Sequence, residues 1–510
     1  MVQIQLSEKT VSIFLCCENF DAYDFFQWNT LFFHSSEILL VVYLMGSLSY
    51  GICYNSSSTL SHPSLLNSIS SFSNFSFLSL FLFFVIKDFN LYEGVSSFNA
   101  IGSGFFPIVI KALLFLTVSF LLVLSRKTLN KQNILKYEYD LLIVFSILGL
   151  SLLVDCNDFL ILYLAIELQS LSFYVLATFH RNSEYNAEAG VKYFVLGSLS
   201  SGLLLFGFSL VYISCGSFYF ENIAKLSGYE SSLTLSGFGF ILVAILFKLG
   251  AFPFHQWLCD VYEGSLITIT AFFAAVPKVV LFALLIRMSF TVFFECYEYS
   301  ETLLHASGLA SVCFASVAAL YQKRLKRLLA YSAISHAGFI LLAIGCNSID
   351  SVKSTMIYLS IYIVMTLTVF SIIFLSSAQS KTPKFLINWA SFASRNLCIA
   401  ATFTCLLFSM AGIPPLAGFY SKLCVFGSLI SHDKIIIAAC IAVFSSIACF
   451  YYIRLIRVIF FTEGMNLFWL GHCASANELF ISSSSLFLVF FLCRSDLIVN
   501  LSTLLGFTLL

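Results

Sequence analysis

Four ionisable side chains lie inside long apolar stretches of this sequence. They are Glu167 in YLAIELQSLSFYVL, Lys248 in FKLGAFPFHQW, Lys278 in AFFAAVPKVVLFALLIR and Lys422 in AGIPPLAGFYSK. A charge at the centre of a bilayer is costly unless it faces the protein interior, and such residues commonly mark ion or proton pathways. Burial lowers the pKa of a lysine and a nearby carboxylate raises it again, so neighbours can switch its charge. We therefore expect a proton relay in which Glu167 switches Lys248. For any one residue, the alternative is a structural charge paired with a neighbour.

Two of these lysines lie beside residues that break helices. Pro253 removes a backbone donor and clashes with the carbonyl of Leu249, so the helix should break just after Lys248. The prolines and glycines of AGIPPLAG, residues 411–418, predict a second break before Lys422. Broken helices are tolerated in a membrane only where protein or water satisfies the freed backbone groups. Two such helices, each with a lysine, indicate a transporter built from inverted repeats.

Two further residues have weaker signals. His255 lies near the first break, where it could donate or accept a proton, although a hydrogen-bonded core histidine is the more common role. Lys192 follows Glu188 by four residues, a spacing that predicts an ion pair on a helix surface. We expect a supporting role for Lys192.

The composition is that of a membrane protein with many spans. Of its 510 residues, 59% are hydrophobic and 10% are charged, and the mean hydropathy is +0.94. The 26 basic and 26 acidic residues cancel, so no net field favours nucleic acid. Cysteines without a CxxC or Cys/His metal spacing predict no iron–sulfur cluster and no zinc, and the lack of glycine-rich phosphate motifs predicts no nucleotide site. The N-terminus lacks the pattern of a transit or signal peptide.

Apolar runs between polar breaks predict an all-α fold with about fourteen transmembrane helices. We divide the chain into an N-terminal region at 1–139 with about three spans, five-helix bundles at 140–290 and 303–460, and a C-terminal helix and tail at 461–510. Basic residues cluster in alternate connections, which places those connections in the compartment of synthesis and both termini on the opposite face. The Ser-rich stretch 55–73 is predicted to be a loop. The expected helices lie near 36–54, 75–91, 104–125, 140–154, 157–178, 189–214, 236–260, 266–288, 303–320, 326–345, 353–377, 396–431, 434–460 and 477–495.

The residues that carry these signals also resemble a known family. The matching stretches are YLAIELQSLSFYVLATFHRNSEYNAEAGVKYFVLGSLSSGLLLFG, FKLGAFPFHQWLCDVYEGS, KRLLAYSAISHAGF, AGIPPLAGFYSK and CFYYIRLIR. They resemble the chain 2 subunits of the proton-pumping NADH:ubiquinone oxidoreductase, respiratory complex I, in the mitochondrially encoded form of plants and protists. The resemblance spans roughly residues 140–461. Leu266 departs from the family, which usually has proline there.

The resemblance implies an antiporter-like subunit of the membrane arm, with two inverted five-helix bundles and no redox centre in this chain. Glu167 would be the glutamate of the fifth helix, Lys278 the central lysine, and Lys248 and Lys422 the lysines of the two broken helices. His336, in YSAISHAGF, would lie on the half-channel path, with a hydrogen-bonded structural role as its alternative.

The resemblance also implies a setting for the chain. The complex would use NADH, FMN, iron–sulfur clusters and ubiquinone in other subunits. Its partners would be other membrane-arm subunits, including neighbouring antiporter-like ones, in the mitochondrial inner membrane. The alternatives are a subunit of an Mrp-type cation/proton antiporter, which shares the broken-helix design, and a purely structural membrane scaffold.

Overall fold

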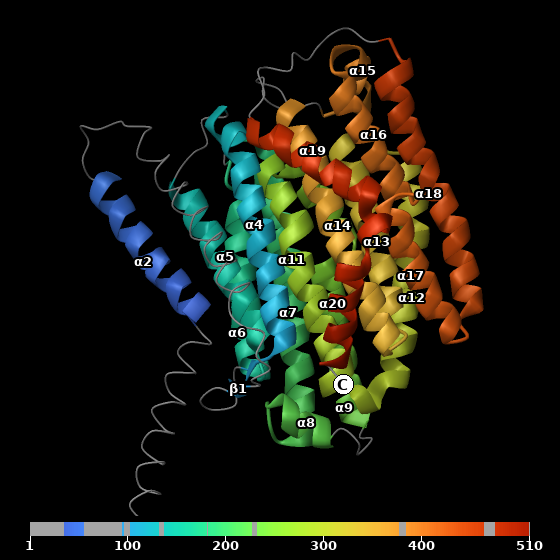
Figure 1. The fold of residues 1–510 in the computed structure, drawn as a ribbon. Coiled ribbons are helices and arrows are strands. Elements are labelled where there is room, and N and C mark those ends of the chain that lie inside the picture. The colour runs from blue at the N-terminus through green and yellow to red at the C-terminus, as the bar shows by residue number, and fades with distance from the viewer. Residues whose placement is uncertain are drawn as a thin grey trace, which may run out of the picture.

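The fold is a bundle of long apolar helices (Figure 1). The computed structural model describes residues 35–55, 94–95, 102–131, 137–180, 182–226, 232–376, 384–463 and 475–508. Within these ranges, eleven helices are long and apolar enough to cross a membrane. The all-helical membrane fold is therefore confirmed. The helix predicted near 75–91, the loop at 55–73 and the first 34 residues lie outside the described residues.

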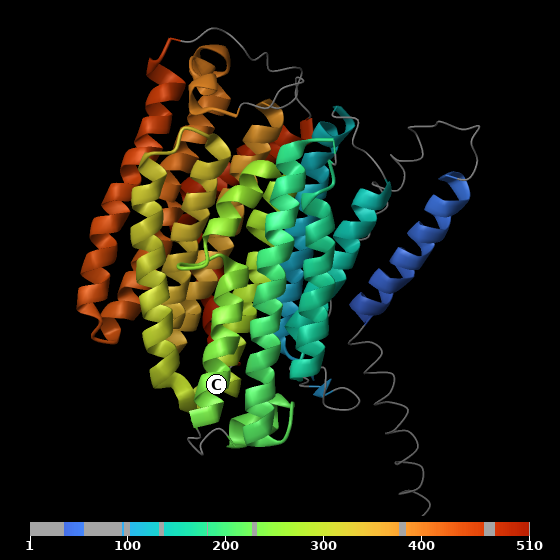
Figure 2. The same ribbon diagram turned by 180° about the vertical axis from the view of Figure 1, so that it is seen from behind.

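The N-terminal region contributes two described helices and one small hairpin. Two-residue strands pair antiparallel, with Gly94 opposite Ser103. The first helix lies at one edge of the bundle, on the side opposite α18 (Figures 1 and 2). The bounds are α2 Ser35–Asn55, β1 Gly94–Val95, β2 Gly102–Ser103 and α4 Phe105–Lys131.

The segment predicted as the first bundle forms five long helices or broken helices and the short helix α8. Its last helix, α11, runs through the centre of the molecule, and its apolar window is wholly buried. The bounds are α5 Tyr137–Asp155, α6 Phe159–Ala177, α7 Glu184–Cys215, α8 Phe220–Leu226, α9 Ser232–Leu249, α10 Gln256–Gly264 and α11 Ile267–Arg287, followed by a π turn at Met288–Val292 and a 3-10 turn at Phe294–Cys296.

In the segment predicted as the second bundle, α14 packs against α11 and α13 packs against α14, and both helices are likewise mostly buried. In the outer helix α18 only 28% of the apolar window is buried, as expected for a helix that faces lipid or another subunit. The bounds are α12 Tyr297–Leu320, α13 Leu325–Ile344, α14 Ile349–Ser376, a 3-10 turn Leu386–Trp389, α15 Phe392–Arg395, α16 Leu397–Ala411, α17 Ala417–Ser431 and α18 Ile435–Phe461.

Both predicted helix breaks are confirmed. The helix before the first break, α9, ends at Leu249, and Gly250 follows with a φ of 71°. The helix before the second, α16, ends at Ala411, and Gly412 caps it with a φ of 85°. A side chain at a positive φ is strained, so glycine suits both positions. Each break thus separates two half-helices: α9 and α10, and α16 and α17.

Two local features differ from the family pattern or from the prediction. Leu266 precedes α11 with a φ of −59°, a value that a proline would also adopt. The C-terminal tail was expected to follow one helix but forms a second one, α20 Asp496–Phe507, after α19 Ser475–Phe490 and a 3-10 turn at Phe491–Arg494. Together α19 and α20 lie along the face of α14.

Candidate proton path

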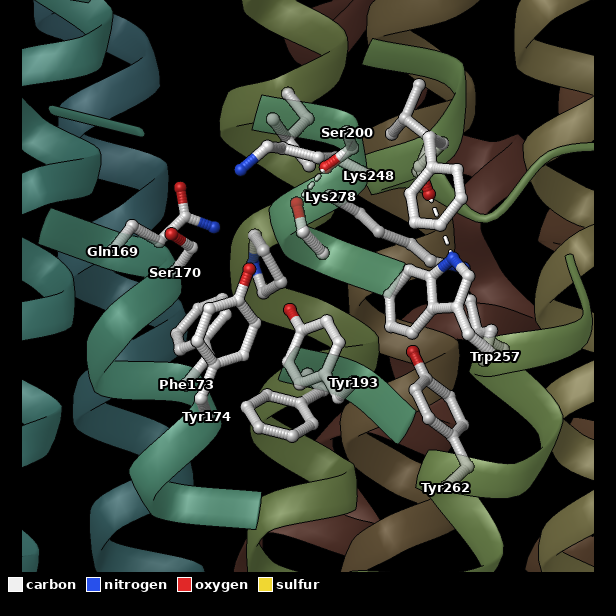
Figure 3. Close-up of a pocket in the computed structure, with 17 residues that line it drawn as sticks. Gln169, Ser170, Phe173, Tyr174, Tyr193, Ser200, Lys248, Trp257, Tyr262 and Lys278 are labelled. Atoms are coloured by element: carbon white, nitrogen blue, oxygen red, sulfur yellow. Dashed lines mark hydrogen bonds between the residues drawn. The ribbon is translucent and has the colours of Figure 1, made fainter. Parts of the chain in front are cut away.

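Lys248 and Lys278 line one cavity of about 30 Å³ in the first bundle (Figure 3). A cavity needs roughly 10–15 Å³ to hold one water molecule, so this one has room for about two. The wall combines these ammonium groups with aromatic rings and small polar side chains. The polar side chains of the wall, besides the lysines, are Gln169, Ser170, Tyr174, Tyr193, Ser200 and Tyr262.

Lys278 reaches out of its own bundle toward the second one. Its side chain is 3% exposed, and its Nζ donates hydrogen bonds to the Ala333 carbonyl at 2.9 Å and to the Tyr362 hydroxyl at 3.1 Å. The Tyr362 hydroxyl in turn donates to the Ala274 carbonyl at 3.1 Å. Since Ala333 lies on α13 and Tyr362 on α14, this lysine joins both bundles.

Two smaller cavities continue from this point. One of about 20 Å³ is lined by Tyr262, which also lines the first cavity, and by Tyr362. The other, of about 10 Å³, is lined by His336 and Lys422. Met410 lines both of the smaller cavities. The three cavities therefore follow one another, each sharing a wall residue with the next.

Lys422 is anchored at the second helix break. Its Nζ donates to the Met410 and Ala411 carbonyls at 3.2 and 2.7 Å. These carbonyls lie at the end of α16, where no further turn of helix can bond them. The lysine thus satisfies groups that the break leaves free, and its ammonium also lies 5.4 Å from the centre of the Phe339 ring.

His336 lies beside Lys422 in the third cavity. Its Nδ1 is 2.7 Å from the Tyr358 hydroxyl, and its Nε2 has no hydrogen-bond partner among the described residues. The ring is 3% exposed. The imidazole therefore has one nitrogen fixed and the other available to a transient partner.

Glu167 is near the first cavity but does not contact Lys248 directly. Its Oε2 accepts a hydrogen bond from Ser170 at 3.2 Å, whereas its buried Oε1 has no hydrogen-bond partner in the described structure. No ion pair within 4 Å joins Glu167 to Lys248, and nothing described here bonds to the Lys248 ammonium. That Glu167 switches the charge of Lys248 therefore stays a prediction. The interaction would act through space or through bridging water.

His255 lies apart from the cavities described above. Its ring centre is 5.4 Å from that of Phe252 and 4.3 Å from that of Phe314, and its Nδ1 is buried without a hydrogen bond. It precedes the first residue of α10. The structure thus surrounds His255 with aromatic rings and does not bring it to the lysines.

The sequence reading missed a buried ion triad. Lys111 of α4 lies 2.6 Å from Glu37 of α2 and also contacts Asp155 at the end of α5. All three side chains are at least nine-tenths buried. The signal was a lysine within the apolar run PIVIKALLFL, but its position near a predicted helix end made it resemble a lysine that reaches the membrane surface.

A network of charges at one end of the bundle was also missed, except for one pair. The predicted Glu188–Lys192 pair is confirmed at 2.7 Å. Lys192 additionally lies 3.0 Å from Asp260 of α10, and Arg327 of α13 lies 2.8 Å from the same carboxylate. This network joins helices far apart in the sequence, so spacing alone could not reveal it.

Chemically, the path combines groups that can each gain or lose a proton. Buried lysines, a histidine and tyrosine hydroxyls alternate with cavities of the size of water molecules. Among the residues that the structure describes, no group of three or more His, Cys, Asp or Glu side chains could hold a metal ion. The arrangement suits proton transfer in short steps.

The sequence is similar to those of known membrane proteins. The family described as "NADH:quinone oxidoreductase/Mrp antiporter, TM" matches residues 156–451. NADH-quinone oxidoreductase subunit N of Pelagibacter ubique is 37% identical over 388 residues, which cover 76% of this chain and 82% of that protein. NADH-ubiquinone oxidoreductase chain 2 of Marchantia polymorpha is 35% identical over 433 residues, which cover 83% and 88%.

A solved structure agrees with the fold. One chain of respiratory complex I from Thermus thermophilus with bound aureothin superposes with a TM-score of 0.77 at 24% identity, covering 92% of this chain and 99% of that one. At this identity the match supports the fold, while the sequence relatives establish the family. The chain belongs to the NADH:quinone oxidoreductase/Mrp antiporter family of membrane proteins, in the group that comprises subunit N and chain 2.

Proposed function

We propose that this chain is a proton-pumping subunit of the membrane arm of an NADH:quinone oxidoreductase, complex I. Its relatives bear the names of subunits of that enzyme. Electrons pass from NADH to quinone in other subunits, which hold the FMN and the iron–sulfur clusters, and this chain has no redox centre. Its task is to convert the released energy into proton movement across the membrane.

The observation that carries this proposal is the series of three cavities lined by lysines, of which Lys278 and Lys422 are buried and Lys248 is partly buried. Lys248 and Lys278 share the first cavity, Tyr362 connects Lys278 to the second, and Lys422 lines the third. A purely structural protein has no need for buried cationic groups beside cavities that fit water, since each such group is costly in a membrane. A relay uses both.

The residues have distinct roles in this proposal. Lys278 carries the proton between bundles because its ammonium already bonds groups of α13 and α14. His336, with a free Nε2, passes it on to Lys422. The negative charge of Glu167 stabilises a proton that arrives on Lys248, through space or through water. His255, which lies outside the cavities, supports the first break.

The setting follows from the relatives that carry the chain 2 name. We propose that the chain resides in the mitochondrial inner membrane, is encoded in the organelle, and assembles with other membrane-arm subunits, among them further antiporter-like chains. The basic connection between α12 and α13, at 321–324, would then face the matrix. Protease or label access to that connection from the intermembrane face of intact mitochondria would contradict this orientation.

A subunit of an Mrp-type antiporter is the alternative, since the family description includes such proteins. Native purification separates the two functions. A complex I subunit purifies in a large assembly that oxidises NADH, whereas an Mrp subunit purifies in an assembly that does not.

The relay is tested by replacing Lys278 with methionine, which has a similar length and no charge. We expect Lys278→Met to lower NADH:quinone activity by about tenfold or more, while NADH oxidation by an artificial acceptor stays normal in the assembled complex. Lys225→Met, which alters an exposed lysine on α8, serves as the control. Normal quinone reduction by assembled Lys278→Met complex would exclude the relay.

A further inference from the structure

The short helix α10 has two faces with different surroundings. Trp257, Leu258 and Tyr262 line the cavity that holds Lys248 and Lys278. Asp260 and Glu263 lie on the other face, since a helix turns by about 100° per residue. The position of α10 therefore determines the shape of the first cavity, and its outer face offers a means of setting that position.

Charges on that outer face connect α10 to α13. Arg327 lies 2.8 Å from Asp260 and also pairs with Glu263, which contacts Arg324 as well. These side chains are partly exposed, with exposed fractions from 16% to 45%. We refer to them as the α10–α13 ion network, which comprises Asp260, Glu263, Arg324 and Arg327.

A backbone contact supplements the network. Lys326, on α13, donates a hydrogen bond of 2.5 Å to the carbonyl of Ser265, the residue that caps α10. At the other end of α10, the Trp257 indole donates to the Phe247 carbonyl at 3.0 Å and so ties the helix back to α9. The short helix is thus held from both sides of the break.

The helix on the other side of the network carries part of the proton path. The Ala333 carbonyl of α13 accepts a hydrogen bond from Lys278, and His336 lies one turn further along. Any shift between α10 and α13 therefore changes the cavity in front of Lys278 and the carbonyl behind it at the same time.

We propose that the α10–α13 ion network positions the proton path at the junction of the two bundles. By fixing α10 against α13, it keeps Lys278 between the first cavity and the groups of the second bundle. This inference rests on the relay proposed above and adds four residues that no cavity of the path contains. They act through α10 and α13 and do not carry the proton themselves.

Several linked pairs are needed for this role because each exposed pair is weak. A single lysine–carboxylate pair leaves both side chains free to rotate. A guanidinium presents several donors in a fixed plane, so Arg327, shared between two carboxylates, restrains both the position and the rotation of α10. The network thus provides orientation more than stability.

The experiment uses the whole assembled complex with Asp260→Asn, Arg327→Gln and their combination. We expect each single variant to lower quinone reduction two- to fivefold, the range of one exposed ion pair, with the artificial-acceptor activity unchanged. Because either change removes the Asp260–Arg327 contact, the double variant should lose less than the product of the two single losses, even though Asp260 also pairs with Lys192. Arg327→Lys, which keeps the charge without the planar fork, should restore part of the loss.

Hydrogen–deuterium exchange at 256–264 measures how firmly α10 is held, because amides exchange when the helix opens locally. We expect faster exchange there in Arg327→Gln than in the unaltered complex. Glu138→Gln removes an exposed carboxylate from the first turn of α5 that pairs with none of the four network residues, so it should change neither exchange nor activity.

Two results would overturn the inference: losses that multiply in the double variant, or faster exchange in α10 with full quinone activity. Either leaves the relay standing. The relay itself fails only if Lys278→Met retains quinone reduction, so the two failures are distinguishable.

Discussion

Gly412 is a position where one methyl group should disturb the proton path and leave the fold in place. It ends α16 with a φ of 85°, and a Cβ there would lie 2.8 Å from both the Cδ and the Nζ of Lys422. That neighbour is the end of a flexible side chain and not backbone. In Gly412→Ala the ammonium should therefore move while the helices stay.

The cost has two parts. A non-glycine residue in the left-handed region costs about 1–2 kcal/mol. A displaced Lys422 also loses its hydrogen bonds to the Met410 and Ala411 carbonyls. Each bond to a charged group contributes roughly 1.5–3 kcal/mol, so the loss of even one corresponds to about a ten- to hundredfold lower population of the positioned ammonium.

A second glycine isolates the first part of the cost. Gly216 ends α7 with a φ of 69°, and a Cβ there meets nothing within 4 Å. Gly216→Ala should therefore show the backbone strain alone, with nearly normal quinone reduction per assembled complex. Gly412→Ala should show about tenfold or greater loss, measured as NADH:quinone activity relative to artificial-acceptor activity. Equal activity in the two variants would refute the role of the Lys422 position.

Three further variants test other parts of the site. Tyr362→Phe removes one of the two hydrogen bonds of Lys278, which contributes about 1.5–3 kcal/mol when the lysine is charged. Quinone reduction should fall about tenfold or more, and an unchanged rate would show that this hydroxyl is dispensable. Gly418→Ala places a Cβ 1.7 Å from the Ser409 carbonyl, whereas Gly427→Ala meets open space; only the first should reduce the amount of assembled complex on native gels, by a loss of about 1–3 kcal/mol in stability. Glu167→Gln should lower quinone reduction strongly and Glu167→Asp less, because only the second keeps the charge; equal rates would exclude an electrostatic role.

Features set by local chemistry could be predicted from the sequence. Both breaks follow from proline and glycine, which act on the backbone wherever they occur. The Glu188–Lys192 pair follows from a spacing of four residues on one helix. Lys278 and Lys422 stood out because an ionisable residue in the middle of an apolar run is rare.

Features that depend on how helices pack could not be predicted. The Lys111 triad takes one residue from each of three helices, and the sequence does not show that these helices pack together. Glu167 was expected to switch Lys248, but whether their side chains touch depends on the rotation of each helix about its axis, which the apolar pattern of nearly uniform helices does not determine. The final helix α20 was hidden in a tail too short to suggest a span.

The burial of α11 has a consequence for the biogenesis of the protein. Transmembrane helices enter the bilayer one after another, and each of them contacts lipid before it packs against other helices. At that stage Lys278 costs about 2.5–3.5 kcal/mol, which the apolar residues of a window with a mean hydropathy of 2.4 can offset. The other helices then enclose it. Polar substitutions on the side of α11 away from Lys278 would therefore prevent insertion of this helix by the translocon, and no assembled protein would form.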